Sequence, residues 1–139
     1  MAKDLYHETV KTALIKEGWL ITHDPMYLAD ETARIDYEID LGAEKLIVAE
    51  RGPEKIAVEV KSFLRASISH EFHSVFGQYL VYLEALKQLA PERVLLLAMP
   101  DFAYERLQDY PFILDLLNRY EVRYIVFDST QPNIVIWKK

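Results

Sequence analysis

The sequence predicts one α/β domain that spans residues 1–139 and is built on a mixed sheet flanked by helices. The length and the 51% hydrophobic content suit one core and are too small for two domains. Three successive strand patterns joined by short links predict an antiparallel meander. A later, almost wholly apolar stretch follows a long helical pattern, which predicts a strand covered on both faces.

The chain begins with a predicted helix over residues 4–17. Apolar side chains recur there at roughly helical spacing, and Gly18 follows as a C-terminal stop. Residues 19–22 are typical of a short strand. Residues 23–25 are expected to break that strand, because Pro25 restricts the residue before it and cannot donate to a ladder.

The predicted meander consists of residues 34–41, 45–50 and 55–61, with a strong turn signal at 51–54. Residues 34–41 alternate strictly between apolar and charged side chains, so their acids share one face. These acids are Asp36, Glu38 and Asp40.

The second half of the chain alternates helical and strand patterns. A long helix is predicted from about Ser69 to Pro91, with an apolar stripe of Phe72, Val75, Phe76, Tyr79, Leu80, Leu83 and Leu86. The remaining predictions are a strand at 93–99, a helical region at 104–120 interrupted near Pro111, and strands at 123–127 and 134–137.

Composition excludes several classes of function. The chain has no cysteine, so disulfides, thiolate zinc sites and cysteine nucleophiles are excluded. No secretory signal and no run of eighteen apolar residues occurs, which predicts a soluble cytoplasmic protein without a membrane partner. The net charge of −6 disfavours a broad DNA-coating surface, so contact with DNA is expected to be local or shared with a partner.

Residues 55–61 carry the candidate chemistry. Alternation places Ile56, Val58 and Val60 on one face of this strand and Ala57, Glu59 and Lys61 on the other. Asp40 and Glu59, with the carbonyl of Val60, are oxygen donors suited to Mg²⁺ or Mn²⁺. Lys61 can stabilise charge on a phosphodiester or orient a water molecule. The alternative for Glu59 and Lys61 is a cross-strand salt pair.

Several longer motifs resemble the XisH family, the fdxN element excision controlling factors, within the PD-(D/E)xK superfamily. The motifs include residues 2–7, 14–19, 39–47 and 54–63. The resemblance covers nearly the whole chain. It implies a restriction-endonuclease-like three-layer fold and a role in site-specific DNA rearrangement beside a separate recombinase, with a small XisI-type partner. The superfamily's usual proline before the motif aspartate is replaced here by Ile39.

The resemblance also implies roles for individual residues. Asp40 and Glu59 correspond to metal ligands and Lys61 to the catalytic lysine. Glu8 corresponds to an acid of the first helix near the metal, and Gln78 to a polar residue of the second helix that faces the site. What remains open is whether the site cuts DNA or survives in a regulatory module that binds the partner or the recombinase, as in a toxin-antitoxin-like pair.

Alternatives remain at four of these positions. Asp36 shares the face of Asp40 and is a second candidate ligand. Glu8 can instead pair with Lys11, and Gln78 can instead bond to solvent. His70 and His73 have helical spacing, but no acidic third ligand is near them in the sequence, which disfavours zinc. A second copy of the chain is a further candidate partner, through an apolar patch of Phe76, Tyr79 and Tyr82.

Overall fold

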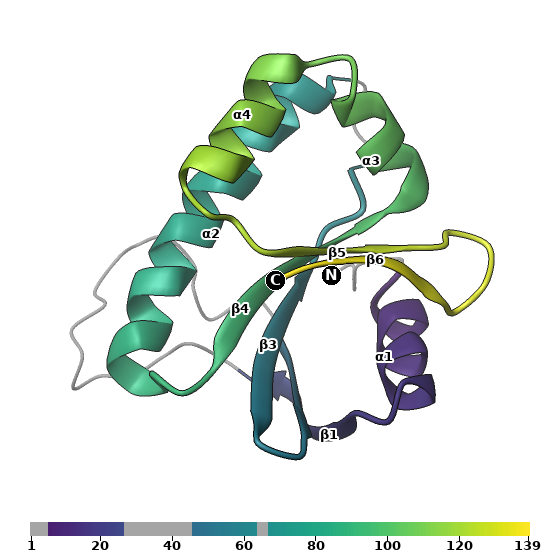
Figure 1. Ribbon diagram of the computed structural model, residues 1–139, viewed down its shortest axis with the longest axis vertical. Helices are drawn as coiled ribbons and strands as arrows, with labels where there is room; N and C mark the ends of the chain where they lie inside the picture. Colours follow the sequence, from purple (N-terminus) through teal and green to yellow (C-terminus); the bar gives the residue numbers. More distant parts are fainter. Residues whose placement is uncertain (1–5, 27–45, 64–66) are drawn as a thin grey trace.

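The computed structural model describes residues 6–26, 46–63 and 67–139, which form a six-stranded sheet with helices on both faces (Figure 1). The strands are β1 (Leu20–Met26), β2 (Leu46–Arg51), β3 (Glu54–Val60), β4 (Val94–Pro100), β5 (Tyr124–Phe127) and β6 (Ile134–Lys138). The helices are α1 (His7–Lys16), α2 (Ile68–Leu89), α3 (Asp101–Leu107) and α4 (Pro111–Arg119). No helix among the described residues is long and apolar enough to cross a membrane.

The sheet is mixed, as predicted. Its spatial order follows the chain, β1-β2-β3-β4-β5-β6. Pairing is antiparallel between β1, β2 and β3 and again between β5 and β6, whereas β3, β4 and β5 are parallel. Parallel neighbours need long crossovers. These are supplied by α2 between β3 and β4, and by α3 with α4 between β4 and β5.

The antiparallel meander is confirmed, but its first strand differs from the predicted one. The strand beside β2 is β1, and it is not formed by residues 34–41, which lie outside the described residues. The predicted break at residues 23–25 is also wrong, because β1 continues to Met26. Since β1 is an edge strand, Pro25 can be accommodated there. The pairing with β2 shifts register between Ile21 and Met26.

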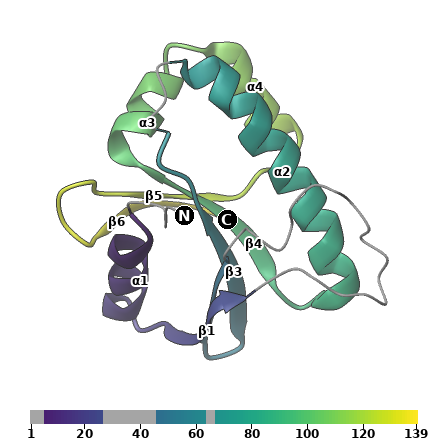
Figure 2. The same ribbon diagram turned by 180° about the vertical axis from the view of Figure 1, so that it is seen from behind.

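Two cores lie on opposite faces of the sheet and give the fold three layers. Strand residues such as Leu46, Ala57 and Leu97 pack against α2, α3 and α4. The alternate residues, such as Val58 and Leu96, form the second core with α1. Figures 1 and 2 show α1 on one side of the sheet and the other three helices on the opposite side.

The helices begin close to the predicted positions. In α2 the Ser67 hydroxyl caps the helix by accepting a hydrogen bond from the backbone N–H of His70 at 3.2 Å. The predicted apolar stripe of α2 needs one correction: Leu80 is exposed, and Tyr82 takes the buried position. Pro111 opens α4, as predicted.

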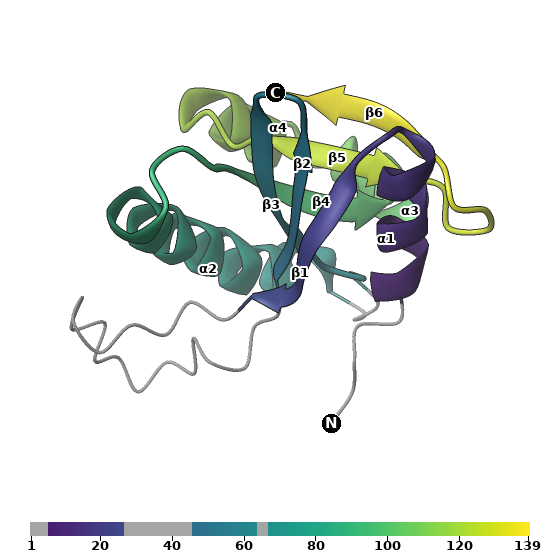
Figure 3. The same ribbon diagram turned by 90° about the horizontal axis from the view of Figure 1, so that it is seen from below.

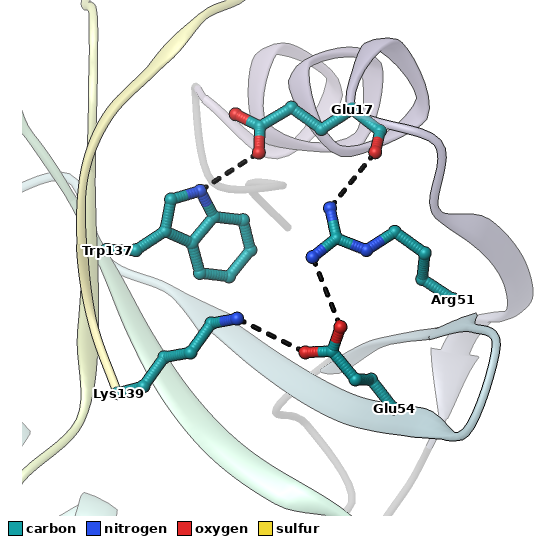
Figure 4. A network of polar contacts seen from close by, with 5 residues as sticks. All are labelled: Glu17, Arg51, Glu54, Trp137 and Lys139. Atoms are coloured by element: carbon teal, nitrogen blue, oxygen red, sulfur yellow. Dashed lines mark hydrogen bonds and ion pairs between the residues drawn. The ribbon is translucent and has the colours of Figure 1, made fainter.

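A polar network joins three distant segments at the end of the sheet where β3 begins (Figure 4). The Arg51 guanidinium donates to the backbone oxygen of Glu17 at 3.1 Å and pairs with Glu54 at 3.2 Å. Lys139 reaches the same Glu54 carboxylate at 3.1 Å, and the Trp137 indole donates to the Glu17 carboxylate at 3.0 Å. The network therefore ties the end of α1 and the β2–β3 turn to the C-terminal strand.

Candidate functional site

Glu59 is a carboxylate inside the core near the end of β3. It pairs across the sheet with Leu46 of β2 and Leu97 of β4, so its side chain lies on the face covered by α2. Only 1% of the residue is exposed. Among the described residues, the buried polar or charged positions are Glu59 and His7. Because burying a carboxylate is costly, its presence here points to a functional role.

Lys61 lies one residue beyond β3, where the strand leaves the sheet. Its backbone N–H donates to the oxygen of Ala98 at 2.9 Å, and the residue is partly exposed. Lys61 follows Glu59 by two positions, with Val60 between them, so strand alternation directs both side chains to the same face. The segment from Glu59 to Lys61 therefore runs from a buried acid to a partly exposed lysine.

The carbonyl of Val60 points away from β4. It belongs to the same planar peptide group as the N–H of Lys61, and that N–H faces β4. The carbonyl is therefore directed to the β2 side, just past the pair formed by Leu46 and Glu59. The Val60 side chain lies on the α1 face.

Tyr79 of α2 covers this part of the sheet and was not recognised from the sequence as a polar residue of the site. Its hydroxyl is buried, donates to the oxygen of Leu95 at 3.1 Å and accepts from the N–H of Arg123 at 3.2 Å. Burial raises the pKa of the Tyr79 hydroxyl, and the nearby negative charge of Glu59 raises it further, against the opposing effect of Arg123. In the sequence, Tyr79 is a member of the predicted apolar stripe of this helix, which indicates burial but not the hydrogen bonds of its hydroxyl.

Gln78 and Glu8 lie in different environments. Gln78 is half-buried on α2, next to Tyr79, on the helix that covers Glu59. Glu8 is exposed in the first turn of α1, and α1 packs on the opposite face of the sheet. Both that turn and the end of β3 lie at the same end of the sheet (Figure 3). The structure thus places Gln78 on the helix that covers the Glu59 face of the sheet. It places Glu8 at the same end of the sheet as Glu59, but on the helix that covers the opposite face.

The remaining predicted ligands lie outside the described residues. Asp40 and Asp36 both fall between β1 and β2 in the sequence, at positions that the structure does not describe. Within residues 6–26, 46–63 and 67–139, no three His, Asp or Glu side chains gather into a metal site. His70 and His73 are exposed on α2. From the described residues, the Glu59 carboxylate and the Val60 carbonyl are oxygen donors of the kind that Mg²⁺ binds.

The model of the family described as XisH protein matches residues 1–135. The chain belongs to the XisH family. No curated protein matches it significantly.

Two crystal structures resemble this XisH-family chain over nearly its full length. One is an XisH family protein from Nostoc punctiforme PCC 73102, with 40% identity and a TM-score of 0.84 over 98% of this chain and 100% of that one. The other is an fdxN element excision controlling factor protein from Anabaena variabilis, with 40% identity and a TM-score of 0.84 over 99% and 100% of the two chains. The chain is therefore related to the fdxN element excision controlling factors.

Proposed function

We propose that this XisH-family chain is a metal-dependent deoxyribonuclease of the PD-(D/E)xK superfamily that acts in programmed DNA excision. The observation that carries the proposal is the buried Glu59, followed two residues later by Lys61 at the end of the third meander strand. The order α1, meander, α2, β4 supports it, because that is the core order of restriction-endonuclease-like proteins. The name of the Anabaena variabilis relative supports the link to excision.

In this proposal, Asp40, Glu59 and the carbonyl of Val60 hold Mg²⁺ or Mn²⁺. Asp40 precedes Leu46 by six residues, and Leu46 pairs with Glu59, so the chain is long enough to bring the two carboxylates together. The cation would supply Lewis acidity at the phosphorus and lower the pKa of the attacking water.

The other site residues would position the substrate and stabilise charge. Lys61, at the surface beside Glu59, would bind the phosphodiester and offset the negative charge that develops during attack. Gln78 would orient groups from the α2 side of the sheet. Glu8 would contribute from α1, at the same end of the sheet. We further propose that the chain works with an XisI-type small protein and a site-specific recombinase.

A second candidate function is a regulatory module that keeps the fold and binds those partners without cutting DNA. Two observations favour it. Glu59 is 1% exposed, so its carboxylate is shielded from a phosphodiester in the described conformation. The net charge of −6 also opposes unassisted binding to DNA.

A cleavage assay distinguishes the two functions. The purified protein is incubated with supercoiled and branched DNA in Mg²⁺ or Mn²⁺, and the wild type is compared with Glu59→Gln and Lys61→Ala. The matched controls are Glu105→Gln on α3 and Lys138→Ala on β6, which alter exposed residues. Cleavage that both site variants lose and both controls keep supports the nuclease. No cleavage with either metal, together with unchanged partner binding by Lys61→Ala, contradicts the nuclease and supports the regulatory module.

A further inference from the structure

An apolar strip lies along the line where α2 and α4 meet. Leu80 of α2 and Phe112 and Tyr120 at the two ends of α4 are 38%, 54% and 52% exposed, which is high for large apolar side chains. Phe76, Leu83 and Leu116 lie with them and are partly buried against the core. An exposed apolar surface of this kind marks an interaction site in soluble proteins.

Helical spacing shows why these side chains form one strip. In α4, Phe112, Leu116 and Tyr120 are four residues apart and form a ridge beside the buried Ile113 and Leu117. In α2, residues 76, 80 and 83 form the corresponding ridge beside the buried stripe.

The two ridges lie on helices that share one core. In the projection of Figures 1 and 2, α4 runs along the first half of α2. The rings of Phe76 and Tyr120 meet edge to face, with centroids 5.9 Å apart. The exposed side chains therefore belong to one surface, which we call the α2–α4 face.

The rim of the α2–α4 face is electrically balanced. Exposed Glu84 and Lys87 flank it on α2, and exposed Asp115 and Arg119 flank it on α4. Each helix thus offers one acid and one base, whereas the chain as a whole carries a net charge of −6. That net charge opposes association of two copies in every orientation, so a contact between them needs a locally balanced surface. At this face the local charges cancel, and each acid can meet a base of the other copy.

We propose that two copies of the chain associate through the α2–α4 face by a two-fold interface. A two-fold interface brings the same patch of both copies together, so the patch must complement itself in shape and charge. An apolar centre with aromatic side chains and a rim that carries both signs meets that requirement. The assignment corrects the sequence-based patch: Tyr79 and Tyr82 are buried, and Leu80, Phe112 and Tyr120 replace them. It does not depend on nuclease activity.

Sedimentation over a range of protein concentrations tests the proposal. The wild type is expected to form dimers as its concentration rises. Phe112→Ser and Leu80→Ser are each expected to weaken self-association roughly tenfold or more, as truncation of a central interface residue does. The controls are Leu20→Ser on β1 and Val135→Ser on β6, which remove exposed apolar side chains far from the face. Circular dichroism checks that every variant remains folded.

Cross-linking locates the interface directly, because the chain has no cysteine of its own. The variants Leu80→Cys, Phe112→Cys and Tyr120→Cys are treated with a short bismaleimide and compared with Val135→Cys. Faster dimer formation at the three α2–α4 positions supports the proposal. A wild type that stays monomeric at every concentration overturns it. So does self-association that the Ser variants leave unchanged, or cross-linking no faster than at Val135. A chain that stays monomeric but binds a different protein through the α2–α4 face would assign that face to the other protein instead.

Discussion

The Tyr79 hydroxyl donates a hydrogen bond to the backbone oxygen of Leu95 at 3.1 Å. The Tyr79 hydroxyl oxygen also accepts a hydrogen bond from the backbone N–H of Arg123, the residue before β5, at 3.2 Å. One side chain of α2 therefore links β4 to the start of its parallel neighbour β5 through hydrogen bonds inside the core.

Removing this hydroxyl with Tyr79→Phe is expected to lower the free energy of unfolding by about 1–3 kcal/mol. The ring would still fill its place, but the N–H of Arg123 would lose its partner. Urea unfolding measures the change. Tyr120→Phe is the control, since Tyr120 is about half exposed and lies outside the core. Equal stability of Tyr79→Phe and the wild type would contradict the assigned role.

Arg51 is the centre of the polar network at the end of the sheet where β3 begins. Its guanidinium lies 4.6 Å from the centre of the Trp19 ring, in addition to its bonds to Glu17 and Glu54. Arg51→Met keeps most of the aliphatic length and removes all three interactions. We expect a loss of about 1–2 kcal/mol, most of it from the bond to Glu17 and the contact with Trp19, because the exposed pair with Glu54 is screened by solvent.

Thermal unfolding of Arg51→Met beside Lys138→Met checks this expectation. Lys138 is exposed on β6, so its substitution is expected to leave the melting temperature nearly unchanged. A similar small effect for both variants would show that the network does not stabilise the fold.

Alternation predicted which side chains of β3 share a face, because it depends only on local geometry. It placed Glu59 and Lys61 on one face, and the structure has Glu59 on the side of Ala57 and Leu97. Alternation cannot say which helix covers that face or how deeply. The near-complete burial of Glu59 depends on α2, which is contributed by residues that follow it in the chain.

The first strand was harder to predict for a related reason. A proline such as Pro25 is normally excluded from a strand that has neighbours on both sides. The sequence does not reveal that β1 lies at the edge of the sheet, where a proline is tolerated. The alternation at 34–41 also looked like the natural neighbour of β2, yet β1 occupies that position. Strand order depends on long-range packing, which short patterns do not contain.

Acid is expected to weaken the fold through Glu54. Hydrogen bonds from Lys139 and then Arg51 hold the pKa of the Glu54 carboxyl below its usual 4.5. A lowered pKa adds stability above the unfolded value, and that stability is lost as the pH falls through the folded value. The melting temperature of the wild type should therefore decline below about pH 4.5, and Glu54→Gln should make the decline shallower. An identical slope in both proteins would contradict the assignment.

Alkali is expected to act through Tyr124. Burial, followed by the charge and hydrogen bond of Tyr104, raises the pKa of Tyr124 to about 12. Because the folded pKa lies above the usual 10.0, the stability that this group contributes is complete below pH 10.0 and is lost as the pH rises toward 12. The pKa of Tyr79 is also raised, so the tyrosinate absorbance of the folded protein should keep a late rise in Tyr124→Phe but lose amplitude near pH 12. An unchanged amplitude near pH 12 in Tyr124→Phe would contradict the assignment.

Metal binding can be tested without any assay of DNA cleavage. If Glu59 is a ligand, Mn²⁺ should raise the melting temperature of the wild type, because a ligand at about 100 times its Kd adds about 2.7 kcal/mol to the folded state. Glu59→Gln has nearly the same shape and should lose that response. Glu84→Gln, on the exposed surface of α2, should keep it.

Asp40→Asn and Asp36→Asn extend the test to the second carboxylate: we expect Asp40→Asn to lose the response and Asp36→Asn to retain it. The opposite result would make Asp36 the ligand, and an Mn²⁺ response that survives in Glu59→Gln would remove Glu59 from the site.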